Sequence, residues 1–317
     1  MKKILITRKL IKSSEEHAAK IFEASINKED KLLTKDELIK KSEDCDGILS
    51  SLTEKIDADV ISKLSERIKI ISNFAVGFGN IDTKAAKKRN IIVTNTPDVL
   101  TDATAEIAIL ILLGAARRAK EGTEWVKKKN WKWSADFLMG KQLTGSRLGI
   151  LGMGRIGRAV AERARAFGMK IHYYNRSRLD ENLEKGATYH QSLESLLSVS
   201  DFFSINCPAT KETKHIINKN TLKYFPDGAV LSNSARGDMI DDDAMVDALK
   251  NGKIYSLGLD VYNGEPNIHP EYLNLPNVYV LPHLGSATRK TRTAMADLAV
   301  DNIDEFFKIG KCKNTVN

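Results

Sequence analysis

Three side chains that could act together on a carboxylic acid each follow a predicted strand in the last third of the chain. Arg236 lies in SNSARGDMID, Glu265 in LDVYNGEP and His283 in LPHLGSAT. A guanidinium group binds a carboxylate through two parallel hydrogen bonds, and an imidazole gives or takes a proton near neutral pH. A carboxylate beside that imidazole favours its charged form. Together these groups could anchor a 2-oxo acid and protonate its ketone oxygen.

Reduction of such a ketone also needs a hydride, and a glycine-rich turn predicts the site of its donor. The turn follows the apolar run RLGIL and precedes a helical pattern, which is the context that a dinucleotide site requires. Its glycines allow a tight turn, close approach of a pyrophosphate and close packing of helix on strand, and the helix offers free N–H groups to phosphates. The predicted site consists of Gly152, Met153, Gly154, Arg155, Ile156 and Gly157.

The second strand of this unit indicates which dinucleotide is preferred. An NAD site usually has an acidic residue about 20 positions after the glycine motif, on the ribose 2′-hydroxyl. Here the residue 175 − 157 = 18 positions after Gly157 is Asn175, followed by Arg176, Ser177 and Arg178. Asn175 and Ser177 can donate hydrogen bonds, and the two arginines can pair with a 2′-phosphate. We therefore expect NADP(H) to be preferred and NAD(H) to be possible, unless the arginines are merely solvated.

The elements that must position these residues form two α/β blocks. Their strands are apolar at consecutive positions, which is typical of parallel sheets buried on both faces, and ligands bind beyond the carboxyl ends of such strands. In the first block we expect strands at 3–7, 46–50, 68–72 and 91–95, and helices at 13–25, 34–41, 57–65 and 82–89. In the second we expect strands at 147–151, 170–174, 201–206, 229–233, 254–259 and 278–281, with helices at 155–167 and 288–308.

The segment between the blocks combines an apolar helix with a cluster of aromatic residues. The predicted helix at 103–120 is apolar nearly all round, which places it between lobes or between subunits. All three tryptophans follow it, at Trp125, Trp131 and Trp133, close to Phe137. This aromatic segment either packs against its own lobe or forms a subunit interface.

Composition excludes several classes of protein. A length of 317 residues predicts roughly two domains, and 42% hydrophobic with 28% charged residues excludes wholesale disorder. The net charge is 49 − 41 = +8, but the basic residues are scattered, which argues against nucleic-acid binding. The longest apolar stretch, 105–116, is about half the length that spans a bilayer, so no membrane association is expected.

The cysteines and the start of the chain predict a cytoplasmic protein. Cys45, Cys207 and Cys312 form no CxxC motif, which indicates reduced thiols, and no metal site is expected. Arg8 and Lys9 interrupt the first apolar run too early for a signal peptide.

The combined motifs resemble those of the D-isomer-specific 2-hydroxyacid dehydrogenases over nearly the whole chain. Within that family the sequence is most similar to glyoxylate/hydroxypyruvate reductases, through NFAVGFGNID and VTNTPDVLTDATAE. The resemblance implies an α/β fold of two Rossmann-like lobes with doubly wound parallel sheets. Residues 1–99 would form a flavodoxin-like substrate lobe, residues 100–285 an NAD(P)-binding Rossmann lobe, and 286–317 a helix returning to the substrate lobe.

The resemblance also implies a role for each site residue. Arg236 would bind the substrate carboxylate and carbonyl, His283 would be the acid–base residue, and Glu265 would be its partner. The substrate would also contact Leu52, Ala75, Val76 and Gly77. Val76 and Gly77 would bind it through their backbone N–H groups. Asp260 would contact the carboxamide side of the nicotinamide. Besides the glycine turn and residues 175–177, the cofactor would contact Thr104, Cys207, Pro208, Thr213, Ser234, Ala235, Arg236, Asp260, His283 and Gly285.

The predicted activity is NADPH-preferring reduction of glyoxylate or hydroxypyruvate to the D-2-hydroxy acid, in a homodimer whose segment 125–140 extends over the twin subunit. One departure from the family is Gly79, where relatives commonly carry Asp, and this could loosen the loop and shift substrate preference. Two alternatives remain open at this stage. One is another D-2-hydroxyacid dehydrogenase of phosphoglycerate or D-lactate type, and the other is a non-catalytic, dinucleotide-sensing corepressor-like protein.

Overall fold

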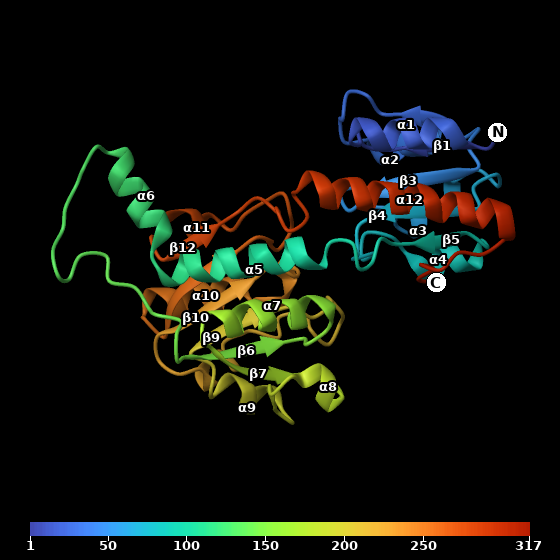
Figure 1. Ribbon diagram of the computed structural model, residues 1–317. Coiled ribbons are helices and arrows are strands. Elements are labelled where there is room, and N and C mark those ends of the chain that lie inside the picture. Colours follow the sequence, from blue (N-terminus) through green and yellow to red (C-terminus); the bar gives the residue numbers. More distant parts are fainter. The chain divides into compact units, whose positions relative to one another are not determined.

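A computed structural model describes residues 1–317, which separate into two compact units. The five-stranded unit comprises Met1–Leu100 and Ser286–Asn317, and the seven-stranded unit comprises Thr101–Gly285. Each is built on one parallel sheet with helices packed against it (Figure 1). The predicted α/β fold with two Rossmann-like lobes is confirmed.

The five-stranded unit has the flavodoxin-like strand order β2-β1-β3-β4-β5. Its strands are β1 (Lys3–Ile6), β2 (Glu23–Ile26), β3 (Gly47–Ser51), β4 (Ile70–Phe74) and β5 (Ile92–Thr94). Its helices are α1 (Lys12–Ile21), α2 (Lys35–Lys41), α3 (Ala58–Lys63), α4 (Thr83–Lys88) and α12 (Arg289–Ile309). The helix predicted over 13–25 is wrong at its end, because residues 23–26 form β2, a strand that pairs only with β1.

Sequence-local signals explain where these helices begin. Asp57 and Asp82 accept hydrogen bonds from the backbone at the starts of α3 and α4, and Thr34 with Glu37 forms a capping box at α2. The long helix α12 then packs against β4 and α1, where Ala299 and Ile303 are fully buried. The C-terminal segment thereby completes the core of the first block.

The seven-stranded unit has the order β12-β11-β10-β9-β6-β7-β8, with every pair parallel. Counted from β6, this is the Rossmann order with one strand added beyond its sixth. The strands are β6 (Arg147–Leu151), β7 (Lys170–Tyr174), β8 (Thr188–Tyr189), β9 (Phe202–Ile205), β10 (Ala229–Asn233), β11 (Ile254–Leu259) and β12 (Val278–Val280). Six of them match predicted strands, and only the two-residue edge strand β8 was not predicted.

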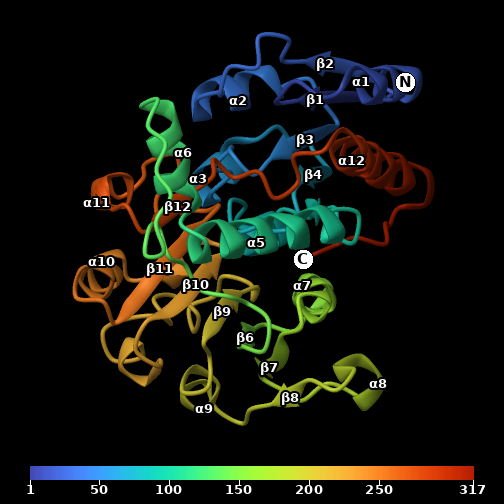
Figure 2. The same cartoon turned by 60° about the vertical axis from the view of Figure 1, so that its left-hand side comes forward.

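Helices α5 and α10 pack against the sheet, whereas α6 projects away from it (Figure 1 and Figure 2). The α-helices are α5 (Thr101–Ala116), α6 (Ala119–Lys127), α7 (Arg155–Ala166), α8 (Glu181–Glu184), α9 (Leu193–Leu197), α10 (Asp242–Lys250) and α11 (Pro270–Asn274). The helix predicted over 103–120 is confirmed over 103–116 as part of α5 and is wrong only at its end, because the left-handed backbone of Arg118 separates α5 from α6. No helix of the chain is both long enough and apolar enough to cross a membrane.

The aromatic segment after α6 is largely exposed. Trp131 and Trp133 are 85% and 79% exposed, whereas Trp125 and Phe137 contact each other edge to face with ring centroids 5.0 Å apart. Packing against its own lobe, one of the two expectations for this segment, is therefore wrong for Trp131 and Trp133.

Candidate active site

The loops after β11 and β12 bring Glu265 and His283 into direct contact. The His283 Nδ1 lies 2.7 Å from Glu265 Oε2, and the other carboxylate oxygen accepts the Tyr262 N–H at 2.9 Å. A carboxylate can only accept, so His283 Nδ1 carries the proton and Nε2 stays available to a ligand. The two side chains are 27% and 28% exposed, so solvent or a ligand can reach them. His283 also has a φ of +57°, a backbone conformation that clusters at functional sites.

The electrostatics of this pair keep the carboxylate charged. Burial alone would raise the pKa of Glu265, but the hydrogen bond from His283, its charge, the Tyr262 N–H and the charge of Arg236 outweigh burial and lower that pKa. Burial lowers the pKa of the Arg236 guanidinium, while the negative charges of Glu265 and Asp238 oppose this change. The three predicted residues thus affect one another electrically.

Arg236 reaches this position because the loop after β10 packs directly on the loop after β11. A Cβ at Gly237 would lie 1.9 Å from the Tyr262 carbonyl carbon and 2.2 Å from the Asn263 nitrogen, so only glycine allows this approach. Arg236 Nη1 donates to the carbonyl of Ala235 at 2.6 Å, and its guanidinium forms no ion pair within the chain. Its other N–H groups can therefore bind the carboxylate of a ligand.

Asp260, directly after β11, is a buried carboxylate with one unused oxygen. Its Oδ1 accepts the Leu284 N–H at 2.7 Å, whereas Oδ2 is buried and accepts no hydrogen bond. Burial raises the pKa of this carboxyl group. Thr104 Oγ1 donates to the Gly285 carbonyl at 3.0 Å and fixes the adjoining loop. A buried acceptor without a partner is costly, and the amide of a nicotinamide would satisfy it.

The glycine turn has the shape that a pyrophosphate needs. Gly152 has a φ of +94°, and a Cβ there would lie 2.5 Å from the Cys207 nitrogen. A Cβ at Gly157 would lie 2.2 Å from the Gly152 carbonyl oxygen, but one at Gly154 would meet nothing within 4 Å. Gly154 begins α7 without a side-chain cap, so the first N–H groups of the helix are open to phosphate. These residues therefore fit a dinucleotide.

Cys207 supports the turn by packing rather than by reactivity. Burial raises the pKa of its thiol to about 11, so it stays protonated at neutral pH. In the loop that follows, Thr213 Oγ1 donates to the Pro208 carbonyl at 2.9 Å and accepts the Thr210 N–H at 2.7 Å. Three of the residues predicted around the cofactor thus lie in one ordered loop after β9.

The loop after β7 corrects one expectation. Asn175 Oδ1 accepts the Met153 N–H at 2.7 Å, which ties this loop to the glycine turn. Arg178 donates from Nε and Nη2 to Glu184, at 2.8 and 3.0 Å. Arg178 is therefore neither poised for a 2′-phosphate nor merely solvated, because a carboxylate of the protein already binds its guanidinium. Arg176 and Ser177 are exposed.

Sequence reasoning missed two residues that shape the site. Asn233, at the end of β10, accepts the Ala235 N–H at 3.0 Å and donates to the Arg236 carbonyl at 2.7 Å, beside the buried Ser234. Tyr262 donates its N–H to Glu265, and its hydroxyl donates to Leu281 at 2.6 Å. Asn at the point where a strand gives way to a turn is a known signal, but the role of Tyr262 has no signature in the sequence.

In the five-stranded unit, the loop after β4 offers two free N–H groups. The Thr96 N–H donates to the Ala75 carbonyl. Asn95 Nδ2 donates to the Val76 carbonyl, and Asn73 Nδ2 donates to the Gly77 carbonyl. The N–H groups of Val76 and Gly77 have no partner within the chain, an arrangement that suits an anion. Leu52 is partly exposed after β3. A Cβ at Gly79 would meet nothing within 4 Å, so this departure from the family places no steric demand on the loop.

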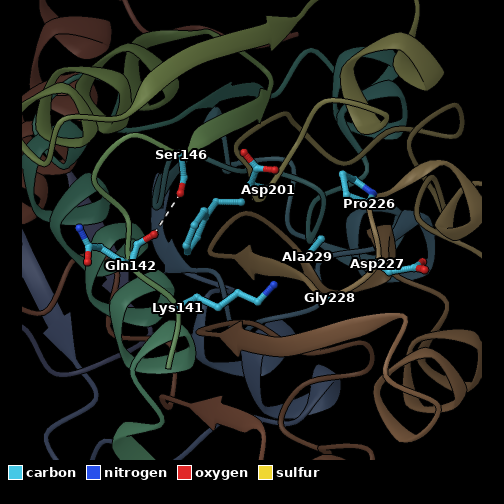
Figure 3. A pocket seen from close by; sticks show the side chains of 9 residues that line it. Lys141, Gln142, Ser146, Asp201, Pro226, Asp227, Gly228 and Ala229 are labelled. Carbon is cyan, nitrogen blue, oxygen red and sulfur yellow. Dashed lines mark hydrogen bonds between the residues drawn. The ribbon is translucent and has the colours of Figure 1, made fainter. Parts of the chain in front are cut away.

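A cavity of about 290 Å³ elsewhere in the seven-stranded unit is separate from these loops (Figure 3). It lies where β6, β9 and β10 begin and is lined by residues including Lys141, Asp201 and Ala229. In a parallel sheet this is the edge opposite the carboxyl ends, and no predicted site residue lines the cavity.

Comparison with known proteins identifies the family. Residues 109–285 match the model of the D-isomer specific 2-hydroxyacid dehydrogenase NAD binding domain. The chain is 44% identical to a glycerate dehydrogenase from Hyphomicrobium methylovorum, over 96% of each chain. It is 41% identical to a glyoxylate reductase from Thermococcus litoralis, over 99% of this chain and 96% of the relative.

Solved structures similar to this chain have the same kinds of activity in their names as these relatives. A glyoxylate reductase from Paecilomyes thermophila superposes with a TM-score of 0.91 at 34% identity, covering 99% of this chain and 98% of that one. An NADPH-dependent glyoxylate/hydroxypyruvate reductase from Sinorhizobium meliloti, in complex with NADP and malonate, gives 0.89 at 34% identity, covering 99% and 96%. Sequence, fold and family match together show that the chain is an enzyme of the D-isomer specific 2-hydroxyacid dehydrogenase family.

Proposed function

We propose that this enzyme reduces glyoxylate or hydroxypyruvate to the D-2-hydroxy acid and prefers NADPH to NADH. The observation that carries the proposal is the 2.7 Å contact between His283 and Glu265, next to the unpaired guanidinium of Arg236. The relatives named glyoxylate reductase and glycerate dehydrogenase support a small 2-oxo or 2-hydroxy acid as substrate.

The protein's own groups have separate tasks in this reaction. Arg236 holds the substrate carboxylate through two parallel hydrogen bonds, which orients the ketone. His283 donates the proton from Nε2 to the ketone oxygen, and Glu265 holds the ring in place through Nδ1. When bound, the nicotinamide cofactor supplies the hydride.

Residues around the glycine turn would hold the dinucleotide. The open space at Gly154 and the uncapped start of α7 suit the pyrophosphate, and Asp260 Oδ2 suits the carboxamide. Preference for NADPH is supported by Arg176 and Ser177, which are exposed in a loop that lacks the acidic residue of NAD sites.

The test is a kinetic comparison of both cofactors with a panel of 2-oxo acids. We expect the highest kcat/KM with NADPH and glyoxylate or hydroxypyruvate, and lower values with pyruvate and phosphohydroxypyruvate. A higher kcat/KM with NADH would contradict the cofactor assignment. Binding of NADPH without turnover of any 2-oxo acid would instead support a dinucleotide sensor.

We also propose a homodimer, supported by the exposed aromatic segment 125–140. Side chains as large and as exposed as Trp131 and Trp133 are typical of interfaces rather than of free surfaces. Sedimentation should give twice the chain mass for the wild type. A monomer would contradict this part of the proposal, and a shift to monomer in Trp131→Ser/Trp133→Ser would locate the interface.

A further inference from the structure

The loop after β7 is fixed at both ends by hydrogen bonds. At its start, Asn175 Oδ1 accepts the Met153 N–H at 2.7 Å. At its end, the Leu179 N–H donates to the Tyr173 hydroxyl at 3.0 Å. Arg176 and Ser177 lie between these anchors, and both are exposed. The loop therefore presents a short tip of fixed shape.

A buried carboxylate holds the far anchor together. Glu184, on α8, is only 4% exposed and accepts the Tyr173 hydroxyl at 2.5 Å in addition to the two N–H groups of Arg178. Hydrogen bonds from Arg178 and Tyr173 lower the pKa of Glu184 to about 2, so it is charged at neutral pH. The Arg178 side chain is itself 64% exposed, but two charge-assisted bonds to one buried carboxylate are strong and directional, and they hold the Arg178 guanidinium on the protein. We refer to Tyr173, Arg178 and Glu184 as the Glu184 cluster.

The neighbouring arginine, Arg176, is exposed as Arg178 is, but no carboxylate of the protein binds it. Arg176 forms no hydrogen bond or ion pair within the chain. Its charge does reach Glu212, in the loop after β9, where a hydrogen bond with Thr210 and, to a smaller extent, Arg176 lower the pKa of the carboxyl group. Of the two guanidinium groups in the loop, only that of Arg176 is free to bind a phosphate.

We propose that Glu184 is a positioning residue for cofactor selection. By holding Arg178 it fixes the loop so that Arg176, with Ser177, contacts the 2′-phosphate of NADPH, while Arg178 itself contacts no part of the cofactor. This inference rests on the proposed preference for NADPH and specifies how that preference is achieved. A preorganised tip binds more tightly because little order has to be gained on binding.

The experiment measures dissociation constants of NADPH and NADH by fluorescence titration of the free enzyme, with thermal unfolding recorded for each variant. Arg176→Met should raise the dissociation constant of NADPH about 10- to 100-fold, as expected for the loss of a charge-assisted bond. The dissociation constant of NADH should stay unchanged. Arg178→Met and Glu184→Gln should each raise the dissociation constant of NADPH by the same, smaller factor. The double variant should raise it by no more than either single variant. Arg178→Lys, which keeps one charged bond, should restore most of the loss.

Glu181→Gln is the matched control. It removes the same charge from the same helix, but Glu181 is exposed and does not hydrogen-bond Arg178. We expect it to bind both cofactors as the wild type does.

Two results would overturn the inference in distinguishable ways. If Arg178→Met weakens NADPH as much as Arg176→Met while Glu184→Gln has no effect, Arg178 is itself a phosphate ligand and the Glu184 cluster does not position the loop. If the wild type prefers NADH, the proposed cofactor is wrong and this inference falls with it. A folded Glu184→Gln variant with wild-type affinity for NADPH would also contradict it.

Discussion

Two regions at the loop edge of the seven-stranded sheet use polar and charged groups in opposite ways. After β10, β11 and β12, Arg236, Asp260 and His283 each keep a donor or an acceptor that no group of the protein satisfies. After β7, Arg178 donates hydrogen bonds to Glu184, and Asn175 accepts one from the Met153 N–H. The first region keeps its polar groups available for a ligand and the second uses them to fix a shape. Under the proposed function, the first set of groups would act on the ligand and the second would position the loop that selects the cofactor.

The largest effect should come from the acid–base residue. His283→Asn removes the Nε2 proton donor, so we expect kcat for glyoxylate reduction to fall by about 10²- to 10⁴-fold. The dissociation constant of NADPH should change far less than kcat, because the glycine turn and the loop after β7 are untouched. Steady-state kinetics and fluorescence titration measure the two quantities, and near-native turnover would show that the site is misassigned.

The next effect should come from the anchor. Arg236→Lys keeps the charge but loses the planar pair of donors, so KM for glyoxylate should rise about tenfold or more. Arg67→Lys, at an exposed arginine of the five-stranded unit, is the control and should leave KM unchanged. A KM unaffected in Arg236→Lys would mean that the guanidinium does not bind the carboxylate.

A backbone contact holds the reactive region together and can be broken selectively. The methyl group of Gly237→Ala would collide with the backbone of Tyr262, and such overpacking costs about 1–3 kcal/mol of unfolding free energy. Gly79→Ala, where a Cβ meets nothing within 4 Å, should change it by less than about 0.5 kcal/mol. Denaturant unfolding measures both, and equal effects would contradict the close approach of the two loops.

The smallest effect concerns the stability of the Glu184 cluster and depends on pH. The pKa of Glu184 is lowered from 4.5 to about 2, so its stabilising charge is fully present above pH 4.5 and is lost as the pH falls toward 2. The melting temperature of the wild type should exceed that of Glu184→Gln by a constant amount above pH 4.5, and the gap should close below it. A gap that persists at the lowest pH would show that packing, not charge, causes it.

The comparison also shows which parts of the molecule a sequence can reveal. The strands that carry Arg236, Glu265 and His283 are continuous apolar runs that end in Gly- or Pro-containing turns, so both the sheet and the site edge were predictable. The strand β2 was missed because its residues are half exposed and continue the helical pattern of α1. The strand β8 has only two residues and carries no periodicity.

Partners of site residues were harder to predict than the residues themselves. Arg178 lies in the loop after β7, as the predicted strand implied, but its partner Glu184 sits on a helix of four residues with no pattern of its own. Tyr262 positions Glu265 through its backbone N–H, which any residue type except proline could supply. Such contacts depend on how loops pack, and spacing along the chain does not encode them.

The central claim is that His283 and Glu265 act as one acid–base unit in the reduction of a 2-oxo acid. A double-mutant cycle on kcat/KM for glyoxylate, with His283→Asn, Glu265→Gln and the double variant, tests it most directly. If the pair acts as a unit, the double variant should be no slower than His283→Asn alone, whose loss is about 10²- to 10⁴-fold. Losses that multiply, or a Glu265→Gln variant with wild-type kcat/KM, would contradict the account.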